Sequence, residues 1–189
     1  MTQSAAVSPE YVLLGLLNQQ PAHGYALHER ITQELGTIWH ISLSQTYNLL
    51  NRLEAQGYIA GMTQEQEKLP ARRKFRLTSA GRRRFEDWLS APTEPSAHAI
   101  RVEFLTRLFF AFAISPASAR SVIDQQIAST QDGLAHLQTM LSELPPDQTF
   151  SQLGLEFRVQ QLAAVIEWLN TSQTKSGLDQ SHQEPGTMP

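Results

Sequence analysis

Residues 43–55 carry polar side chains at a spacing that suits contact with a nucleic acid. Small or apolar residues recur there at helical spacing, at Leu43, Thr46, Leu49, Leu50 and Leu53. The opposite face of the expected helix presents Gln45, Asn48, Asn51 and Arg52. Asn and Gln can pair bidentately with adenine and Arg with guanine, so this face has the chemistry to read base edges. An ordinary amphipathic helix with a solvated outer face would show the same pattern.

Serines mark the start of this helix, and a glycine marks its end. Ser42 and Ser44 introduce it, and we expect Ser44 to cap its first amides, which could equally hold a phosphate. Gly57 is expected to end it.

A basic segment follows directly. Residues 72–84 hold seven basic residues and no acid: Arg72, Arg73, Lys74, Arg76, Arg82, Arg83 and Arg84. Two strands are expected, at residues 59–64 and 74–78, with residues 64–70 as the loop between them. Taken alone, the run is also compatible with a solvated basic surface. Together, a polar-faced helix and a basic hairpin are the layout of a winged helix-turn-helix that binds double-stranded DNA.

Three further helices complete the N-terminal half. The pattern predicts them at residues 11–18, 23–35 and 78–89, the last capped by Thr78. Residues 92–96 are expected to form a short linker. We therefore predict a DNA-binding domain over residues 1–92.

The second half has a different charge and a different pattern. Residues 1–92 carry a net charge of +2 and residues 93–189 a net charge of −5, within a chain total of −3. Residues 99–113 predict an apolar helix, and Ser115-Pro116 predicts the start of the next. That helix has a heptad stripe: Ile123, Ile127, Thr130, Leu134, Leu137, Leu141 and Leu144. After Pro145-Pro146, a last helix has a matching stripe: Leu155, Leu162, Val165, Ile166 and Leu169.

The fold class expected is mainly α: a winged helix-turn-helix with a small two-stranded β wing, followed by an all-α dimerisation domain over residues 93–171. Residues 172–189 are polar, and we expect them to be disordered. The two stripes can pair within one chain as a helical hairpin, and the pair can also dock on a second copy. We favour a homodimer, because symmetric dimers place two recognition helices about 34 Å apart on one face of DNA.

Several classes of function are disfavoured. Cysteine is absent, none of the six histidines forms an i,i+4 pair, and no glycine-rich phosphate loop occurs. No apolar run approaches the roughly 20 residues that span a bilayer, and no secretory signal opens the sequence. We expect a cytoplasmic protein that is not an enzyme and has no cofactor, metal or membrane partner. A helical adaptor that binds only protein is the alternative, but it leaves the basic wing unexplained.

The motifs occur in an order that resembles the PadR family of bacterial transcriptional regulators. These are YVLLGLLNQQPAHGYAL, SLSQTYNLLNRLEAQGYI, RRKFRLTSAGRRRFEDWL, IRVEFLTRLFF and IEWL. The resemblance implies a homodimeric repressor that binds a palindromic operator and is released by a small, often aromatic, effector. By position it places Ser44, Gln45, Tyr47, Asn48 and Arg52 on the recognition helix, His23 and Tyr25 at a phosphate-facing helix start, and Arg72, Arg73 and Lys74 on the wing. The chain departs from the family at Pro70, where members commonly have a glycine near the wing tip.

The effector site has the weakest signal. Aromatic residues offer surface for a flat ligand: Trp39, Trp88, Phe104, Phe109, Phe110, Phe112 and Trp168. Arg101 or Arg107 would pair with a carboxylate on such a ligand. The same aromatic residues also fit the core of a helical protein.

Overall fold

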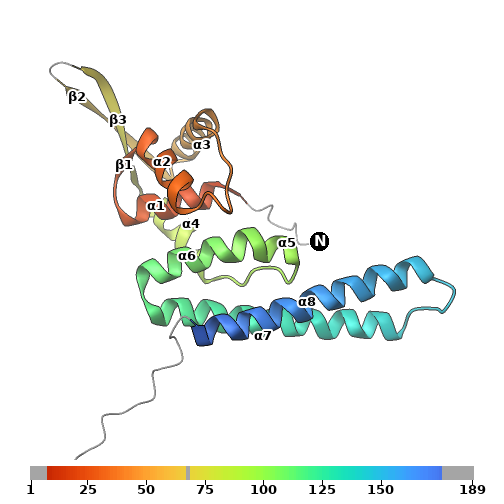
Figure 1. Cartoon of the computed structure of the whole chain (residues 1–189). Coiled ribbons are helices and arrows are strands. Elements are labelled where there is room, and N and C mark those ends of the chain that lie inside the picture. The colour runs from red at the N-terminus through yellow and green to blue at the C-terminus, as the bar shows by residue number, and fades with distance from the viewer. Residues whose placement is uncertain (1–7, 67–68, 176–189) are drawn as a thin grey trace, which may run out of the picture. The chain divides into compact units, whose positions relative to one another are not determined.

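The computed structural model describes residues 8–66 and 69–175. The chain divides into two compact units, Met1–Ala91 and Pro92–Pro189, and each is considered separately (Figure 1).

The first unit is a winged helix-turn-helix. Its elements are α1 (Glu10–Gln19), β1 (Ala22–His23), α2 (Gly24–Glu34), α3 (Leu43–Ala55), β2 (Ile59–Gln66), β3 (Leu69–Leu77) and α4 (Ser79–Ser90). The strands form one antiparallel sheet in the order β1-β3-β2. This confirms the expected fold class and adds β1, a two-residue strand too short to show an alternating pattern.

The core of this unit lies among its helices. On α1, Val12, Leu13, Leu14 and Leu16 have no exposed surface, and α1 contacts α2, α3 and α4. The α3 residues Thr46, Leu49, Leu50 and Leu53 are buried as their spacing predicts. Leu43 is 37% exposed, so its assignment to the core face was wrong. It is the first residue of α3, next to the Ser42 cap, and the buried residues of this helix begin one turn later at Thr46.

The wing strands are longer than predicted. Of the expected 64–70 loop, residues 64–66 belong to β2 and residues 69–70 to β3, and residues 67–68 lie outside the described chain. The register passes from Gln64 opposite Arg72 to Gln66 opposite Leu69, which leaves an extra residue on β3. Pro70 lies within this irregularity, one of the places where a strand tolerates a residue that has no N–H donor.

The backbone segments pack closely where α3, the sheet and α4 meet. Gly57 ends α3 with a φ of 77°, the left-handed conformation that favours glycine. The Thr78 hydroxyl accepts from the Gly81 amide at 3.1 Å and caps α4, as predicted. A Cβ on Gly81 would lie 2.0 Å from the Tyr58 carbonyl oxygen, so only glycine permits this approach.

The second unit is all helical. Its elements are α5 (Ala97–Ala99), the π-helical turn η1 (Ile100–Phe104), α6 (Leu105–Ile114), α7 (Pro116–Ser142) and α8 (Thr149–Lys175). The helix predicted over residues 99–113 is thus a continuous helical run with a π-helical segment near its start. Ser115 caps α7 by accepting from the Ser118 amide, with Pro116 at the first helical position, as expected.

The two heptad stripes meet within one chain. α7 and α8 lie side by side as a long hairpin (Figure 1). Ile123 and Leu169 share one hydrophobic cluster, and Leu137, Leu155 and Leu162 form another. The stripes therefore pair intramolecularly, so they do not themselves require a second chain.

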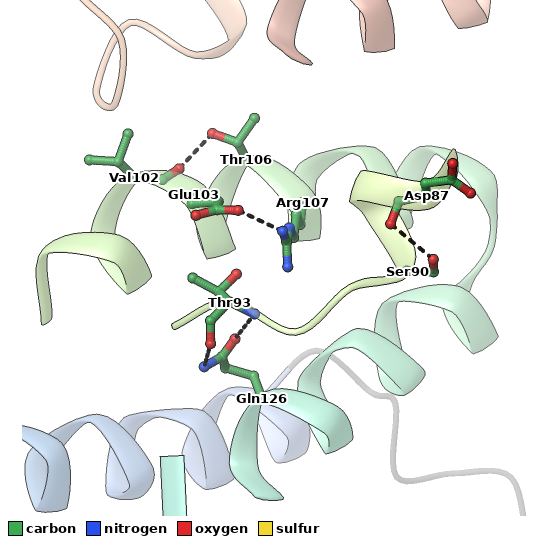
Figure 2. Close-up of polar contacts among 8 residues, drawn as sticks. All are labelled: Asp87, Ser90, Thr93, Val102, Glu103, Thr106, Arg107 and Gln126. Carbon is green, nitrogen blue, oxygen red and sulfur yellow. Dashed lines mark hydrogen bonds and ion pairs between the residues drawn. The ribbon is translucent and has the colours of Figure 1, made fainter. Parts of the chain in front are cut away.

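The segment after Pro92 is fixed to α7 by a buried amide. Gln126 accepts from the Thr93 amide and donates to the Thr93 carbonyl oxygen, both at 3.2 Å (Figure 2). Its amide nitrogen also lies 3.2 Å from the Thr130 hydroxyl. Thr93, which belongs to the linker expected over residues 92–96, is therefore fixed to the helical unit.

The end of α8 corrects one expectation. The helix continues to Lys175, so residues 172–175, which we expected to be disordered, are helical. The Thr171 hydroxyl donates to the Glu167 carbonyl oxygen at 2.9 Å, and Gln173 hydrogen-bonds to Asp124 on α7. These hydrogen bonds stabilise the last turns of α8 despite their polar composition. Residues 176–189 lie outside the described chain.

Candidate nucleic-acid interface

The start of α3 is capped by Ser42 rather than Ser44. The Ser42 hydroxyl accepts from the Gln45 amide at 3.2 Å, and the Gln45 side-chain oxygen accepts from the Ser42 amide at 2.8 Å. This reciprocal capping box corrects the expected cap, and Ser44 lies exposed inside the first turn. Because the cap uses the Gln45 oxygen, Gln45 is not available for bidentate pairing with adenine in this conformation.

The middle of α3 presents the polar face that the spacing predicts. Asn48 and Asn51 are exposed, and Tyr47 is partly exposed beside them. Tyr47 also packs against the start of α2, where a Cβ on Gly24 would lie 2.6 Å from its ring. Gly24 therefore allows the two helices of the helix-turn-helix to approach closely.

Arg52 is turned toward α1. Its Nε lies 2.6 Å from Oε1 of Glu10, a carboxylate that is only 5% exposed. Arg52 faces outward as predicted, with a side chain that is 54% exposed, but its guanidinium is also held by this acid. The helical period of α3 places Arg52 at the surface, but the period carries no information about an acid 42 residues earlier in the chain.

The same carboxylate holds Arg84 of α4. Oε2 of Glu10 lies 2.7 Å from Nη2 of Arg84, whose guanidinium stands 4.4 Å from the centre of the Tyr58 ring. Burial alone would lower the pKa of Arg84, but hydrogen bonds with Tyr58 and Tyr11 and the charge of Glu10 outweigh it, so this pKa is raised. Glu10 thus ties α1, α3 and α4 together through two cations.

The base of the wing is built around Arg73. Its Nη2 lies 2.7 Å from Oε1 of Glu54, near the end of α3, and its carbonyl oxygen lies 3.0 Å from Nδ1 of His23. His23 is the residue before α2 and also pairs with Lys74 in the sheet. The structure therefore brings together three of the predicted site residues, His23, Arg73 and Lys74.

The remaining candidates are placed less fully. Tyr25 is exposed in the first turn of α2. Lys74 is half-buried, whereas Arg76 and Arg83 are exposed. Arg72 belongs to β3, but its side chain lies outside the described part of the chain. The reasoning from sequence missed Glu10 and Glu54, and no local signal distinguishes them from ordinary surface acids.

Two parts of the chain match known protein families. Residues 13–87, which span α1 to α4, match the model of the transcriptional regulator PadR-like family. The chain contains a PadR-like domain. Residues 100–175 match a second model, described as virulence activator alpha C-term. The helical unit of this PadR-like regulator therefore also resembles a known protein family.

Two relatives agree with this assignment. The chain is 28% identical over 135 residues to the negative transcriptional regulator PadR of Bacillus subtilis, covering 71% of this chain and 74% of that one. It is 25% identical over 88 residues to a probable transcriptional regulator of Mycobacterium tuberculosis, covering 47% and 46% of the two chains. These relatives are regulators rather than enzymes.

Solved structures of PadR proteins are also similar. B. subtilis PadR in complex with operator DNA has a TM-score of 0.45 and 24% identity, covering 86% of this chain and 96% of that chain. A PadR-like regulator of Bacillus cereus has a TM-score of 0.43 and 22% identity, covering 93% and 99%.

The effector residues predicted for this PadR-like chain are divided between the two units. Trp39 lines a hollow of about 620 Å³ between the end of α2 and the start of α3. Trp88 is buried in the same unit, stacked 4.6 Å from Tyr11. In the helical unit, Phe104 is fully buried and meets Trp168 edge-to-face at 6.2 Å. Trp88 and Phe104 are therefore core residues, which corrects their assignment to a ligand surface.

The cations proposed for an effector carboxylate differ from each other. Arg101 is exposed. Arg107 is buried and lies 2.5 Å from Glu103, one helical turn earlier (Figure 2). Within the described residues, no group of three His, Asp or Glu side chains could hold a metal, and no helix is long and apolar enough to cross a membrane.

Proposed function

We propose that this chain is a homodimeric repressor that binds a palindromic operator. In this proposal α3 contacts the bases and the wing contacts the flanking phosphates. The observation that carries the proposal is the exposed Asn48 and Asn51 face of α3 beside the basic wing, within a PadR-like domain. The named activity of the B. subtilis relative, negative regulation of transcription, supports repression. The wing cations supply contacts that position the protein, and the two asparagines supply base readout.

The proposed dimer uses a second stripe on α8. Phe150, Leu153 and Phe157 are 89%, 59% and 60% exposed, and their spacing places them on one side of the helix. This side is nearly opposite the one that carries Leu155, Leu162 and Leu169 into the hairpin. An apolar stripe of this kind favours a protein interface. A second copy of the chain is the partner that would also supply a second recognition helix.

The proposed effector is a small aromatic acid. Its site would draw on the exposed Arg101 and the partly exposed Trp168 rather than on the buried Trp88 and Phe104. p-Coumaric acid, named as the ligand in one B. subtilis PadR structure, is a suitable first probe. It should quench tryptophan fluorescence and release the protein from DNA at the same concentrations. No change in either signal would contradict this choice of effector.

Selection from a pool of random duplexes tests the operator. The proposal expects enrichment of an inverted repeat whose half-site centres are about one DNA turn, or a multiple of it, apart. Enrichment of a single half-site would contradict the dimer. Enrichment of no sequence would contradict sequence-specific repression.

A further inference from the structure

Glu54 connects the recognition helix to both strands of the wing through one oxygen. Its Oε1 accepts from the Gly61 amide of β2 at 2.9 Å and from Nη2 of Arg73 on β3 at 2.7 Å. The acid is 26% exposed and the arginine 48% exposed. The pair is thus accessible to solvent on one side and fixed to the backbone on the other.

The sequence around this contact leaves little room for another arrangement. A Cβ on Gly61 would lie 2.8 Å from Oε1 of Glu54 and 3.0 Å from Nη2 of Arg73. The Arg73 guanidinium also stands 5.5 Å from the centre of the Phe75 ring, and Phe75 is buried. Arg73 is therefore held from two sides, by a carboxylate and by an aromatic ring.

We infer that Glu54 is a positioning residue that increases the selectivity of DNA binding by restraining Arg73. The inference rests on the proposed function, because it concerns how the same surface distinguishes an operator from other DNA. An arginine that is free to move would bind phosphate on any duplex, because the electrostatic attraction between guanidinium and phosphate does not depend on base sequence. A guanidinium paired with Glu54 loses part of that attraction and offers its remaining donors in one direction only.

The test compares Glu54→Gln with the wild type on two duplexes of equal length. One is the sequence enriched from the random pool, and the other is its scrambled counterpart. Glutamine can still accept from the Gly61 amide, but without the carboxylate charge it holds the Arg73 guanidinium less strongly. On the scrambled duplex we expect affinity to rise about two- to fivefold, the effect of one exposed ion pair. We also expect the salt slope to steepen by roughly one phosphate contact. Affinity for the enriched duplex should change less, so selectivity falls.

Two controls separate positioning from general charge. Glu86→Gln makes the same change in net charge at an exposed position on α4 and should leave the slope unchanged. In an Arg73→Gln background, Glu54→Gln should have no effect on the slope, because the residue through which it acts has been removed. Thermal melting should show that each variant is folded.

Three results would overturn the inference: an unchanged salt slope, an equal increase in the Arg73→Gln background, or affinity shifts of the same size on both duplexes. A wild-type protein that prefers neither duplex would contradict the proposed function itself, and with it any role in selectivity. The wild-type measurement alone shows this outcome, so failure of the proposed function is distinguished from failure of the inference about Glu54.

Discussion

At the scale of single residues, the polar side chains around α3 differ in how freely they can meet DNA. Asn48 and Asn51 are exposed, whereas Gln45 is used in a capping box and Arg52 is paired with Glu10. Apart from Leu43, the helical period correctly predicts which side chains of α3 reach the surface. It cannot show which of them are held by a distant residue, because the partner is brought in by the fold.

A substitution at Asn48 tests whether α3 reads bases. Asn48→Ala should weaken binding to the operator by about 1 to 3 kcal/mol, the usual contribution of a bidentate contact to discrimination. Binding to a scrambled duplex should change little, because the lost contact is to a base. Fluorescence anisotropy on both duplexes measures the difference. Equal losses would make Asn48 a residue that positions the protein rather than one that reads sequence.

At the scale of elements, helices with a strong apolar period or a serine or threonine cap are predicted well from sequence. Thr78 and Ser115 cap α4 and α7 as expected, and the heptad stripes form the α7–α8 seam. The sheet is predicted less well, since β1 has only two residues and the wing strands extend through Pro70. Strand pairing depends on contacts distant in sequence, which local patterns do not encode.

Gly81 tests how closely α4 must approach the sheet. Gly81→Ala should lower the free energy of unfolding by about 2 kcal/mol or more, because the new Cβ would meet the Tyr58 backbone oxygen, which cannot move independently. Gly154→Ala is the matched control, since a Cβ there has no neighbour within 4 Å. It should raise stability by up to about 1 kcal/mol through helix propensity. Denaturant unfolding compares the two, and similar effects would contradict the close approach at Gly81.

At the scale of the whole molecule, the chain combines a DNA-reading unit with a helical unit that carries an exposed apolar stripe. The intramolecular hairpin already satisfies the predicted heptads, so the proposed dimer would use a different surface. Sequence alone could not separate these roles, because apolar residues on both sides of α8 follow helical spacing. Their exposure in the folded unit distinguishes them.

Phe157 tests the proposed dimer surface. Phe157→Glu should shift the protein from dimer to monomer in light scattering coupled to size exclusion, because the interface would have to bury a charge. Ala163→Glu on the same helix is exposed but lies outside both stripes, so it should leave the dimer intact. A Phe157→Glu protein that remains dimeric would place the interface elsewhere.

Sequence-specific binding to DNA can be measured by fluorescence anisotropy. Anisotropy of a labelled duplex from upstream of the chain's own gene is compared with that of a scrambled duplex over a range of salt concentrations. We expect tight binding in which the logarithm of the affinity falls linearly with the logarithm of salt concentration, and a preference of at least about a thousandfold for the upstream duplex. Weak and equal binding to both duplexes would contradict specific recognition of this DNA.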